Sequence, residues 1–476
     1  MRYDYDLVVI GGGAAGLVAA TGAASLGAKT CMIEKNKLGG DCTWYGCVPS
    51  KALLKSSQVV SLLRRINEFG ITPKQGMEFD TTNVMSHVRE IVQKVSTHHP
   101  AQLFEERGIK VIFAAPRFIS NRILELNGSK ISSKRFIICT GSHPSVPAIE
   151  GLKDISYLTN ENIFDLQTLP KSIAVLGGGP IGAELSQALL RLGVRVSIVE
   201  MMDRLLFRED EEIAKVLADR LLKEGASIYI GKRAVKFSKD NGLIAITLED
   251  KNKVQTVLKV ENVLVAVGRA PNVSGLDLEK AGVRYDNKGI EADSSLRTSA
   301  RNIYACGDVV GPYQFSQMAE YQAIIAVGNA LFPFKRKVNY NAVPWCTFSD
   351  PEVAHLGLLE EEARGKYNNL RVYKSMYNAN DRAVTDLEED GFAKVICDAK
   401  GNILGAHIVG ANAGEIIHEY VLAKSSGLKI SKLSSAIHIY PTLAQVIKRT
   451  GDEYYKEILS RGWFKKVSAF FINMLR

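Results

Sequence analysis

The chain has no run of about 18 apolar residues, which excludes a membrane-spanning helix of ordinary length. We also expect no secretory leader, because its first apolar stretch, LVVI, leads directly into glycines as a strand would. No nucleic-acid-binding motif accompanies the excess of 60 Lys and Arg over 51 Asp and Glu, a net charge of +9. We therefore expect a cytoplasmic protein that binds no nucleic acid and whose mild positive charge favours anionic cofactors or surfaces.

Cysteine is scarce, with seven residues among 476, so a disulfide scaffold is excluded. In a reducing compartment, a close pair of cysteines is more often catalytic or metal-binding than structural. Five of the seven are expected to be small buried apolar residues: Cys31, Cys139, Cys306, Cys346 and Cys397. The other two, Cys42 and Cys47, lie five positions apart in GGDCTWYGCVPSK (39–51) and need another explanation.

Two stretches share one pattern, in which an apolar strand runs into glycines, a helical stretch follows and a second strand ends in an acid. They are DYDLVVIGGGAAGLVAATGAASLGAKTCMIEK and KSIAVLGGGPIGAELSQALLRLGVRVSIVE. Such glycines let the backbone approach a pyrophosphate at a helix N-terminus, and the acid bonds a ribose hydroxyl. The predicted cofactor-binding residues are Gly11, Gly13, Gly16 and Glu34 in the first unit, and Gly177, Gly179, Gly182 and Glu200 in the second. Two units predict a flavin and a nicotinamide nucleotide, with a hydride passed between them.

Glu200 also bears on which nicotinamide nucleotide binds. An acid at the end of the second strand bonds the free 2′-hydroxyl of NADH and repels the 2′-phosphate of NADPH, so NADH is favoured. Arg204 and Arg208 follow within a few residues and leave NADPH open.

The spacing of Cys42 and Cys47 bears on their chemistry. In a regular helix, five positions span about 7.5 Å along the axis. A disulfide requires Cα atoms closer than about 7 Å, so the segment has to depart from an ideal helix, and Gly46 could supply that departure. A thiolate near a helix N-terminus has a lowered pKa, so a reduced Cys47 would stay ionised. No cluster of His or Cys accompanies the pair, so we predict a redox pair and no metal site.

These motifs resemble the flavoprotein disulfide reductases, or class I pyridine nucleotide-disulfide oxidoreductases, which include dihydrolipoamide dehydrogenase, glutathione reductase and mercuric reductase. GGDCTWYGCVPSK is similar to the redox motif of that family, and further segments follow in the family's order over nearly the whole chain. Those segments are FIICTGSHP (136–144), VLVAVGRAPN (263–272), NIYACGDV (302–309), TFSDPEVAHLG (347–357) and GAHIVGANAGEII (405–417).

The resemblance implies an α/β fold with two Rossmann-like dinucleotide-binding domains, for FAD and NAD(P), and a C-terminal α+β dimerisation domain. The length of the chain agrees, since 476 residues predict roughly two to four domains. We expect the first part of the FAD domain at 1–147, the NAD(P) domain at 148–272, the central second part of the FAD domain at 273–340, and the interface domain at 341–476. The implied cofactors are FAD and NAD(H), with NADP(H) open, and the implied assembly is a homodimer.

The resemblance also implies roles for single residues. Cys47 would be the flavin-proximal, charge-transfer thiol, and Cys42 the interchange thiol that meets the substrate. Lys51 would lie near the flavin and pair with Glu184. The further cofactor-binding residues that it implies are Thr140, Gly141, Gly268, Gly307 and Asp308, the last of which would bond the ribityl chain.

One segment departs from the family. There, a histidine of the partner subunit, held by a glutamate in a His-Pro-Thr-x-x-Glu run, assists the thiol exchange as a base. This chain reads HIYPTLAQV (438–446), with Tyr440 in place of that histidine and Gln445 in place of the glutamate. Tyrosine is a poor base at pH 7, since its ordinary pKa is about 10. Two interpretations of His438 stay open: a substitute base, since alternate residues of an extended segment point the same way, or a structural side chain.

The electron acceptor is the remaining question. Mercuric reductase tolerates the loss of this histidine and has a tyrosine in the same neighbourhood, but it also carries a C-terminal cysteine pair, whereas no cysteine follows Cys397 here. Asp41 and Trp44 stand where the family has threonine and asparagine, which indicates an altered acceptor pocket. We predict that electrons pass from NADH through FAD and Cys42–Cys47 to a small-molecule disulfide or a thiol-reactive metal ion. The open alternatives are a dihydrolipoamide dehydrogenase-like enzyme with an altered base, a flavin-direct quinone or metal reductase, and a non-catalytic redox sensor.

The C-terminal tail interleaves aromatic and aliphatic residues with Lys and Arg from Tyr454 onward. Such a segment could lie on an anionic membrane or receive a quinone. The favoured interpretation is a final helix that docks on its own protein or on its dimer mate.

Overall fold

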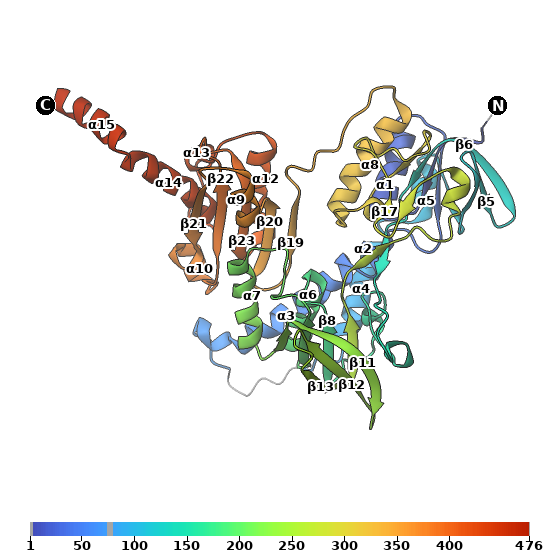
Figure 1. Ribbon diagram of the computed structural model, residues 1–476, viewed down its shortest axis with the longest axis horizontal. Coiled ribbons are helices and arrows are strands. Elements are labelled where there is room, and N and C mark those ends of the chain that lie inside the picture. The colour runs from blue at the N-terminus through green and yellow to red at the C-terminus, as the bar shows by residue number, and fades with distance from the viewer. Residues whose placement is uncertain (1–2, 74–79, 476) are drawn as a thin grey trace.

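The computed structural model describes residues 3–73 and 80–475, so residues 1–2, 74–79 and 476 of the predicted domains lie outside the described residues. The described chain forms three lobes, each built around its own β-sheet (Figure 1). The first lobe contains the N-terminus, the second follows in the middle of the chain, and the third contains the C-terminal segments.

A mostly parallel sheet with the strand order β3-β2-β1-β6-β5-β4 forms the first lobe, and β18 also pairs with β6. The strands are β1 (Tyr5–Ile10), β2 (Thr30–Glu34), β3 (Ile109–Phe113), β4 (Arg117–Ser120), β5 (Ile123–Leu126), β6 (Ser129–Ile138) and β18 (Ile303–Ala305). The helices that accompany this part of the chain are α1 (Ala14–Ser25), α2 (Gly40–Trp44), α3 (Cys47–Arg64), α4 (Val84–Ser96), α5 (Ala101–Glu106) and α8 (Ser316–Leu331). The apolar run of β1 is buried throughout, as expected of a parallel strand that is covered on both faces.

The second lobe repeats the dinucleotide-binding arrangement with a parallel sheet of order β10-β9-β8-β14. An antiparallel sheet of order β11-β12-β13 is attached to it. The elements are β8 (Ser172–Leu176), α6 (Pro180–Arg191), β9 (Arg195–Glu200), α7 (Glu211–Lys223), β10 (Ser227–Ile230), β11 (Lys232–Asp240), β12 (Leu243–Asp250), β13 (Gln255–Val260) and β14 (Asn262–Val265). The chain enters this lobe after β7 (Ser142–Pro144) and leaves it at β15 (Arg269–Pro271), and these two strands pair with each other.

An antiparallel sheet of order β19-β20-β23-β22-β21 forms the third lobe. Its strands are β19 (Pro344–Thr347), β20 (Glu352–Gly357), β21 (Arg371–Met376), β22 (Phe392–Cys397) and β23 (Ile403–Gly410). Its helices are α9 (Glu360–Lys366), α10 (Asp381–Thr385), α11 (Ala413–Ile416), α12 (His418–Ser425), α13 (Ile430–Ser435), α14 (Gln445–Ser460) and α15 (Gly462–Met474). The α/β fold with two dinucleotide-binding units and a C-terminal α+β domain is therefore confirmed. The domain boundaries at 147, 272 and 340 stay predictions.

The C-terminal helix α15 extends away from the rest of the molecule (Figure 1). Its apolar side chains are exposed at Val467, Phe470, Phe471, Ile472 and Met474. The described part of the chain therefore leaves this face of α15 uncovered, which argues against docking on its own protein, and docking on the dimer mate stays a prediction. No helix in the described part of the chain has the length and apolar character that a membrane span requires.

A buried lysine joins the second and third lobes. Lys394 of β22 is 2% exposed, and its Nζ lies 2.7 Å from Asp210, 2.7 Å from Glu212 and 2.6 Å from Glu360. Asp210 and Glu212 flank the start of α7, where carboxylates are also favoured by the helix dipole. Glu212 also pairs with Lys374 and Glu360 with Arg364, so among the three it is Asp210 that relies on Lys394 as its counter-charge.

The Lys394→Met variant should be strongly destabilised, because it leaves the buried carboxylate of Asp210 without its counter-charge. Breaking a buried ion pair by removing one partner costs about 3–5 kcal/mol. The measurement is urea denaturation followed by fluorescence. The matched control is Lys215→Met on α7, whose side chain is 71% exposed and should change the midpoint little. Equal midpoints for the two variants would contradict this account of the lobe contact.

Candidate functional site

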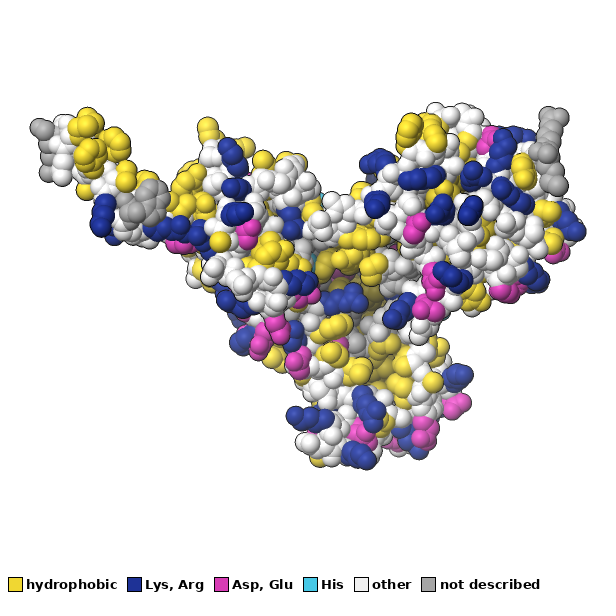
Figure 2. Space-filling view, turned by 45° about the horizontal axis from the view of Figure 1, so that its top comes forward, with side chains coloured by type: hydrophobic (Ala, Val, Ile, Leu, Met, Phe, Trp, Pro, Cys, Tyr) yellow, Lys and Arg dark blue, Asp and Glu magenta, His cyan; other side chains and the backbone are white. Residues whose placement is uncertain are grey.

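A cavity of about 1620 Å³ lies where the three lobes meet. Figure 2 shows hydrophobic side chains gathered in this hollow. Its walls contain both glycine-rich turns, the thiol pair and residues of the third lobe such as Trp345 and Phe348. The structure therefore brings the two predicted cofactor sites and the predicted redox pair into one continuous space.

The first glycine-rich turn is too tight for side chains. Gly11 has φ +108°, and a Cβ placed on it would lie 2.3 Å from the carbonyl oxygen of Cys139. A Cβ on Gly16 would lie 1.8 Å from the carbonyl oxygen of Gly11, so helix α1 packs directly against the turn. Glu34 accepts a hydrogen bond of 2.6 Å from the N–H of Gly12 and holds the turn in place. This geometry leaves backbone N–H groups at the start of a helix and fits the pyrophosphate of a dinucleotide.

The second turn repeats the geometry of the first. Gly177 has φ +103°, a Cβ on Gly182 would lie 1.9 Å from the carbonyl oxygen of Gly177, and Glu200 accepts a 2.6 Å hydrogen bond from the N–H of Gly178. This turn therefore fits a second dinucleotide. Of the two arginines that leave NADPH open, Arg204 bonds to Asp203 and to the carbonyl of Phe207, while Arg208 is exposed and lines the cavity.

The redox segment consists of two helices with a break between them. Helix α2 ends at Trp44 and α3 begins at Cys47, with Gly46 at φ −120° and ψ −106° between them. The expected departure from a regular helix at Gly46 is therefore confirmed. A Cβ on Gly40 would lie 2.7 Å from Cα of Gly13, so the segment is pressed against the first glycine-rich turn.

The two thiols have opposite acidities. A hydrogen bond from Cys42, assisted by Ser316 and Lys51, lowers the pKa of Cys47 to about 6, although burial opposes this shift. The same hydrogen bond, together with burial, raises the pKa of Cys42 well above its ordinary range. Cys47 is also the first residue of α3, where the helix dipole favours an anion. At neutral pH, the pair is therefore one thiolate beside one thiol.

Lys51 and Glu184 form the ion pair that the resemblance implies. The Nζ of Lys51 lies 2.7 Å from Glu184 Oε2, and it also lies 4.5 Å above the ring of Phe348. Glu184 Oε1 accepts a 2.8 Å hydrogen bond from the N–H of Phe348. The pair thus joins α3, α6 and the start of the third lobe beside the thiols.

A polar network surrounds the predicted flavin residues. Asp308 accepts a 2.6 Å hydrogen bond from the hydroxyl of Ser142, and Arg269 donates to the same hydroxyl and lies 3.3 Å from Asp41. Burial raises the pKa of Asp308, although Ser142 and Arg269 act in the opposite direction. The remaining predicted cofactor residues, Thr140, Gly141, Gly268 and Gly307, line the cavity. Arg269 lies within VGRAPN, but its contacts could not be predicted from that motif.

A second close pair of cysteines lies at the ends of two neighbouring strands. The Sγ atoms of Cys139 and Cys306 are 3.5 Å apart, and both residues are buried. The sequence showed no partner for Cys306, because the two residues are 167 positions apart and meet only through the pairing of β18 with β6.

The structure separates the substituted histidine segment from the thiols of its own chain. Neither His438 nor Tyr440 lines the cavity. The His438 ring lies between Glu419 Oε1 at 2.9 Å and the carbonyl of Ala436 at 3.0 Å, so both of its nitrogens have partners. The hydroxyl of Tyr440 donates to Asp381, and this bond raises the pKa of Tyr440. These contacts favour the structural interpretation of His438.

A different histidine lies at the cavity. His418, the first residue of α12, is exposed and is the one histidine among the described residues that lines this space. His418 was not predicted from the sequence. It directly follows the segment GAHIVGANAGEII and belongs to no motif that contains a catalytic base.

Comparison with known proteins defines the class of this protein. The family described as pyridine nucleotide-disulphide oxidoreductase matches residues 5–323, and its dimerisation domain matches residues 343–450. The chain belongs to this family, and the resemblance that its motifs indicate is confirmed. It is an FAD-dependent oxidoreductase of a family that uses FAD and NAD(P)H.

Individual relatives cover nearly the whole chain. Mercuric reductase of Staphylococcus aureus is 34% identical over 457 residues, which are 96% of this chain and 83% of that protein. Dihydrolipoyl dehydrogenase of Corynebacterium glutamicum is 35% identical over 467 residues, which cover 94% of this chain and 97% of that protein. Among solved structures, the Cu(II) complex of the HOCl-induced flavoprotein disulfide reductase RclA from Escherichia coli has a TM-score of 0.85 and 27% identity. The match covers 95% of this chain and 99% of that chain.

The Gly179→Ala variant tests the second cofactor site. A Cβ on Gly179 meets no protein atom within 4 Å, so the fold should be unchanged, but the methyl group crowds the backbone that approaches the pyrophosphate. We expect the flavin content to stay normal and the KM for NADH to rise about 10-fold, which corresponds to about 1.4 kcal/mol. Gly328→Ala on α8 is the control, since a Cβ there also meets nothing within 4 Å. Equal KM values in the two variants would contradict nucleotide binding at this turn.

The acidity of Cys47 predicts a pH profile. In the reduced, FAD-loaded enzyme, the rate of Cys47 alkylation should rise with pH around a midpoint near 6, because only the thiolate reacts. In Cys42→Ala, the main hydrogen bond is lost, so the midpoint should move towards the ordinary value of 9.0. Mass spectrometry of the labelled Cys47 peptide measures the rate. A wild-type midpoint above pH 8 would show that the thiol is not activated.

Proposed function

We propose that this enzyme passes electrons from NADH, through FAD and the Cys42–Cys47 pair, to a thiol-reactive metal ion, as a mercuric reductase-like oxidoreductase. The observation that carries the proposal is the pair itself, a thiolate in hydrogen-bonding contact with a thiol at an open cavity. Sulfur ligands select soft metal ions, and two neighbouring thiols offer two such ligands.

The missing base supports a metal acceptor over a disulfide. Reduction of a small disulfide requires a group that carries protons to and from the interchange thiol. Tyr440, which replaces the family's histidine, has a raised pKa and stays protonated at neutral pH. The identity to mercuric reductase and the structural likeness to a reductase solved as a Cu(II) complex point the same way.

The residues around the pair would serve the chemistry as follows. FAD, when bound, would accept a hydride from NADH and supply two electrons to the pair. Cys47 at the start of α3 would hold negative charge next to the first cofactor site, and Cys42 would meet the acceptor. The Lys51–Glu184 ion pair would keep a positive charge near that thiolate. Ser316, whose Oγ lies 3.7 Å from the sulfur of Cys47, would orient it.

One observation favours a second candidate function. His418 lines the cavity and could take the role of the absent base, in which case a dihydrolipoamide dehydrogenase-like activity on a small disulfide would follow. The two candidates differ in whether turnover depends on an imidazole.

We also propose a cytoplasmic homodimer. Ile437 is 101% exposed and Ile439 is 79% exposed, beside Tyr440 at 65%. Apolar side chains this exposed, next to the segment that in the family reaches the partner's thiols, indicate a surface that a second copy covers.

The decisive experiment is anaerobic NADH oxidation against Hg²⁺, Cu²⁺, lipoamide, glutathione disulfide and a soluble quinone. Wild type, Cys42→Ser and His418→Gln are compared, with His87→Gln, an exposed histidine outside the cavity, as the control. We expect metal-ion turnover that Cys42→Ser lowers at least about 100-fold and that His418→Gln leaves unchanged.

Each other outcome contradicts the proposal in a different way. Preferred turnover of a disulfide that falls in His418→Gln would establish the second candidate function. Equal rates in wild type and Cys42→Ser would show that electrons leave from the flavin. If no acceptor is turned over, the non-catalytic redox sensor is the alternative that remains.

A further inference from the structure

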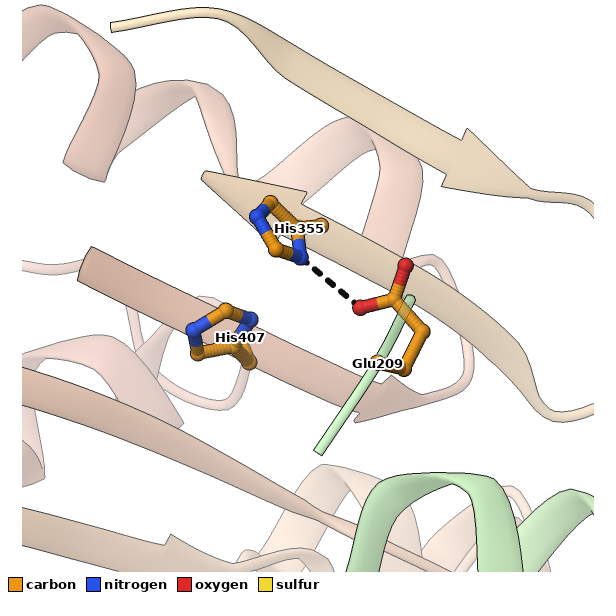
Figure 3. Close-up of side chains that lie close together, drawn as sticks. All are labelled: Glu209, His355 and His407. Carbon is orange, nitrogen blue, oxygen red and sulfur yellow. Dashed lines mark hydrogen bonds and ion pairs between the residues drawn. The ribbon is translucent and has the colours of Figure 1, made fainter. Parts of the chain in front are cut away.

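Three buried side chains from the second and third lobes converge on one point. Glu209 precedes α7 in the second lobe, while His355 of β20 and His407 of β23 are direct partners across two strands of the third lobe. Their exposed fractions are 3%, 2% and 0%. One ligand atom from each lies within 4.8 Å of the other two, and Figure 3 shows a ring nitrogen of His407 turned towards His355 and Glu209.

The backbone determines which nitrogen of each ring is available. The Nε2 atom of His355 lies 2.8 Å from the carbonyl oxygen of Gly357, and that of His407 lies 3.0 Å from the carbonyl oxygen of Leu358. A carbonyl only accepts, so each Nε2 carries its hydrogen and donates it. The two Nδ1 atoms are therefore the ones directed at the common centre.

The Nδ1 atom of His407 is an unexplained polar atom. It is buried and has no hydrogen-bond partner among the described residues. Since Nε2 carries the hydrogen of the neutral imidazole and donates it to Leu358, Nδ1 holds a bare lone pair. Leaving such an atom unsatisfied costs about 1–3 kcal/mol. A simple ion pair between His355 and Glu209, at 2.8 Å, would leave this cost in place.

Hydrogen bonds also fix the orientation of the Glu209 carboxylate. Its Oε1 accepts a 2.7 Å hydrogen bond from the indole N–H of Trp345, which leaves Oε2 for the histidines. The same indole stacks on the His355 ring with centroids 3.6 Å apart and planes at 15°. Metal-binding imidazoles usually donate their second N–H to a carbonyl, and metal-binding carboxylates are themselves hydrogen-bonded, so all three side chains are held as metal ligands are.

We propose that Glu209, His355 and His407 bind a divalent cation of the zinc class through one carboxylate oxygen and two Nδ1 atoms. Two imidazoles and a carboxylate are a common ligand set for Zn²⁺, with bonds of about 2.0–2.2 Å. Glu209 lines the cavity, so a water can complete the tetrahedron from that side. The ion ties the nucleotide-binding lobe to the dimerisation lobe, and it is a resident ion, distinct from any metal that the thiols reduce.

The neighbouring acidic cluster does not compete for this ion. Asp210, Glu212 and Glu360 also lie close together, but the ammonium group of Lys394 lies between them at 2.6–2.7 Å. A cation already satisfies those carboxylates, whereas no Lys or Arg among the described residues forms an ion pair with Glu209.

The test measures metal content and affinity in the oxidised, FAD-loaded enzyme, in which the Cys42–Cys47 pair is closed as a disulfide and cannot bind metal. After chelation and dialysis against Zn²⁺, elemental analysis should give one Zn²⁺ per chain, and Co²⁺ should give the visible absorption of a tetrahedral N/O site. His407→Gln should lower the affinity at least about 100-fold, and Trp345→Phe, which keeps every ligand, about 10-fold. His87→Gln and the Cys42→Ser, Cys47→Ser double variant should keep the full metal content.

Flavin absorbance and the thermal midpoint of the metal-free proteins show whether each variant is folded. Less than about 0.1 Zn²⁺ per chain in wild type would overturn the proposal. So would unchanged affinity in both His407→Gln and Trp345→Phe, or loss of the bound metal in the double cysteine variant. If His407→Gln does not fold, Trp345→Phe decides, since that substitution leaves all three ligands in place.

Discussion

The close approach of Gly13 to Gly40 is the constraint on which the rest of the site depends. A Cβ on Gly40 would lie 2.7 Å from Cα of Gly13, so no side chain fits between the first glycine-rich turn and helix α2. This contact places Cys47, the first residue of α3, beside the turn. The helix dipole, the predicted flavin site and the thiolate therefore meet at one point, and any larger residue would move the thiols away from it.

Glu184 connects this point to the other two lobes. It is 5% exposed, it belongs to α6 of the nucleotide-binding lobe, and it accepts from Lys51 of α3 and from the N–H of Phe348 in the third lobe. A buried carboxylate with partners from two other segments resists any independent movement of the lobes. The proposed zinc ion between Glu209 and the two histidines would act in the same direction, because it also joins the second and third lobes.

In the segment where this chain departs from its family, the side chains of His438 and Tyr440 are bonded to other residues of the same chain. His438 is held by Glu419, and Tyr440 donates to Asp381, so neither is poised to exchange protons with the thiols of its own chain. The acidity difference between Cys42 and Cys47 already arises from their mutual hydrogen bond and from Ser316 and Lys51. A soft metal ion can use such a pair directly, whereas a disulfide requires a proton carrier.

The sequence by itself determined the features that depend on neighbours along the chain. The two glycine-rich turns, the break in the helix at Gly46 and the α/β order of elements follow from local periodicity and spacing, because glycine and strand patterns act over a few residues. Only the tertiary structure decided the features that depend on distant pairing. His355 and Glu209 are 146 positions apart, Cys139 and Cys306 are 167 apart, and Glu419, which contacts His438, lies 19 positions before it on another segment. No local spacing encodes such contacts, since they arise only when strands pair and lobes close on one another.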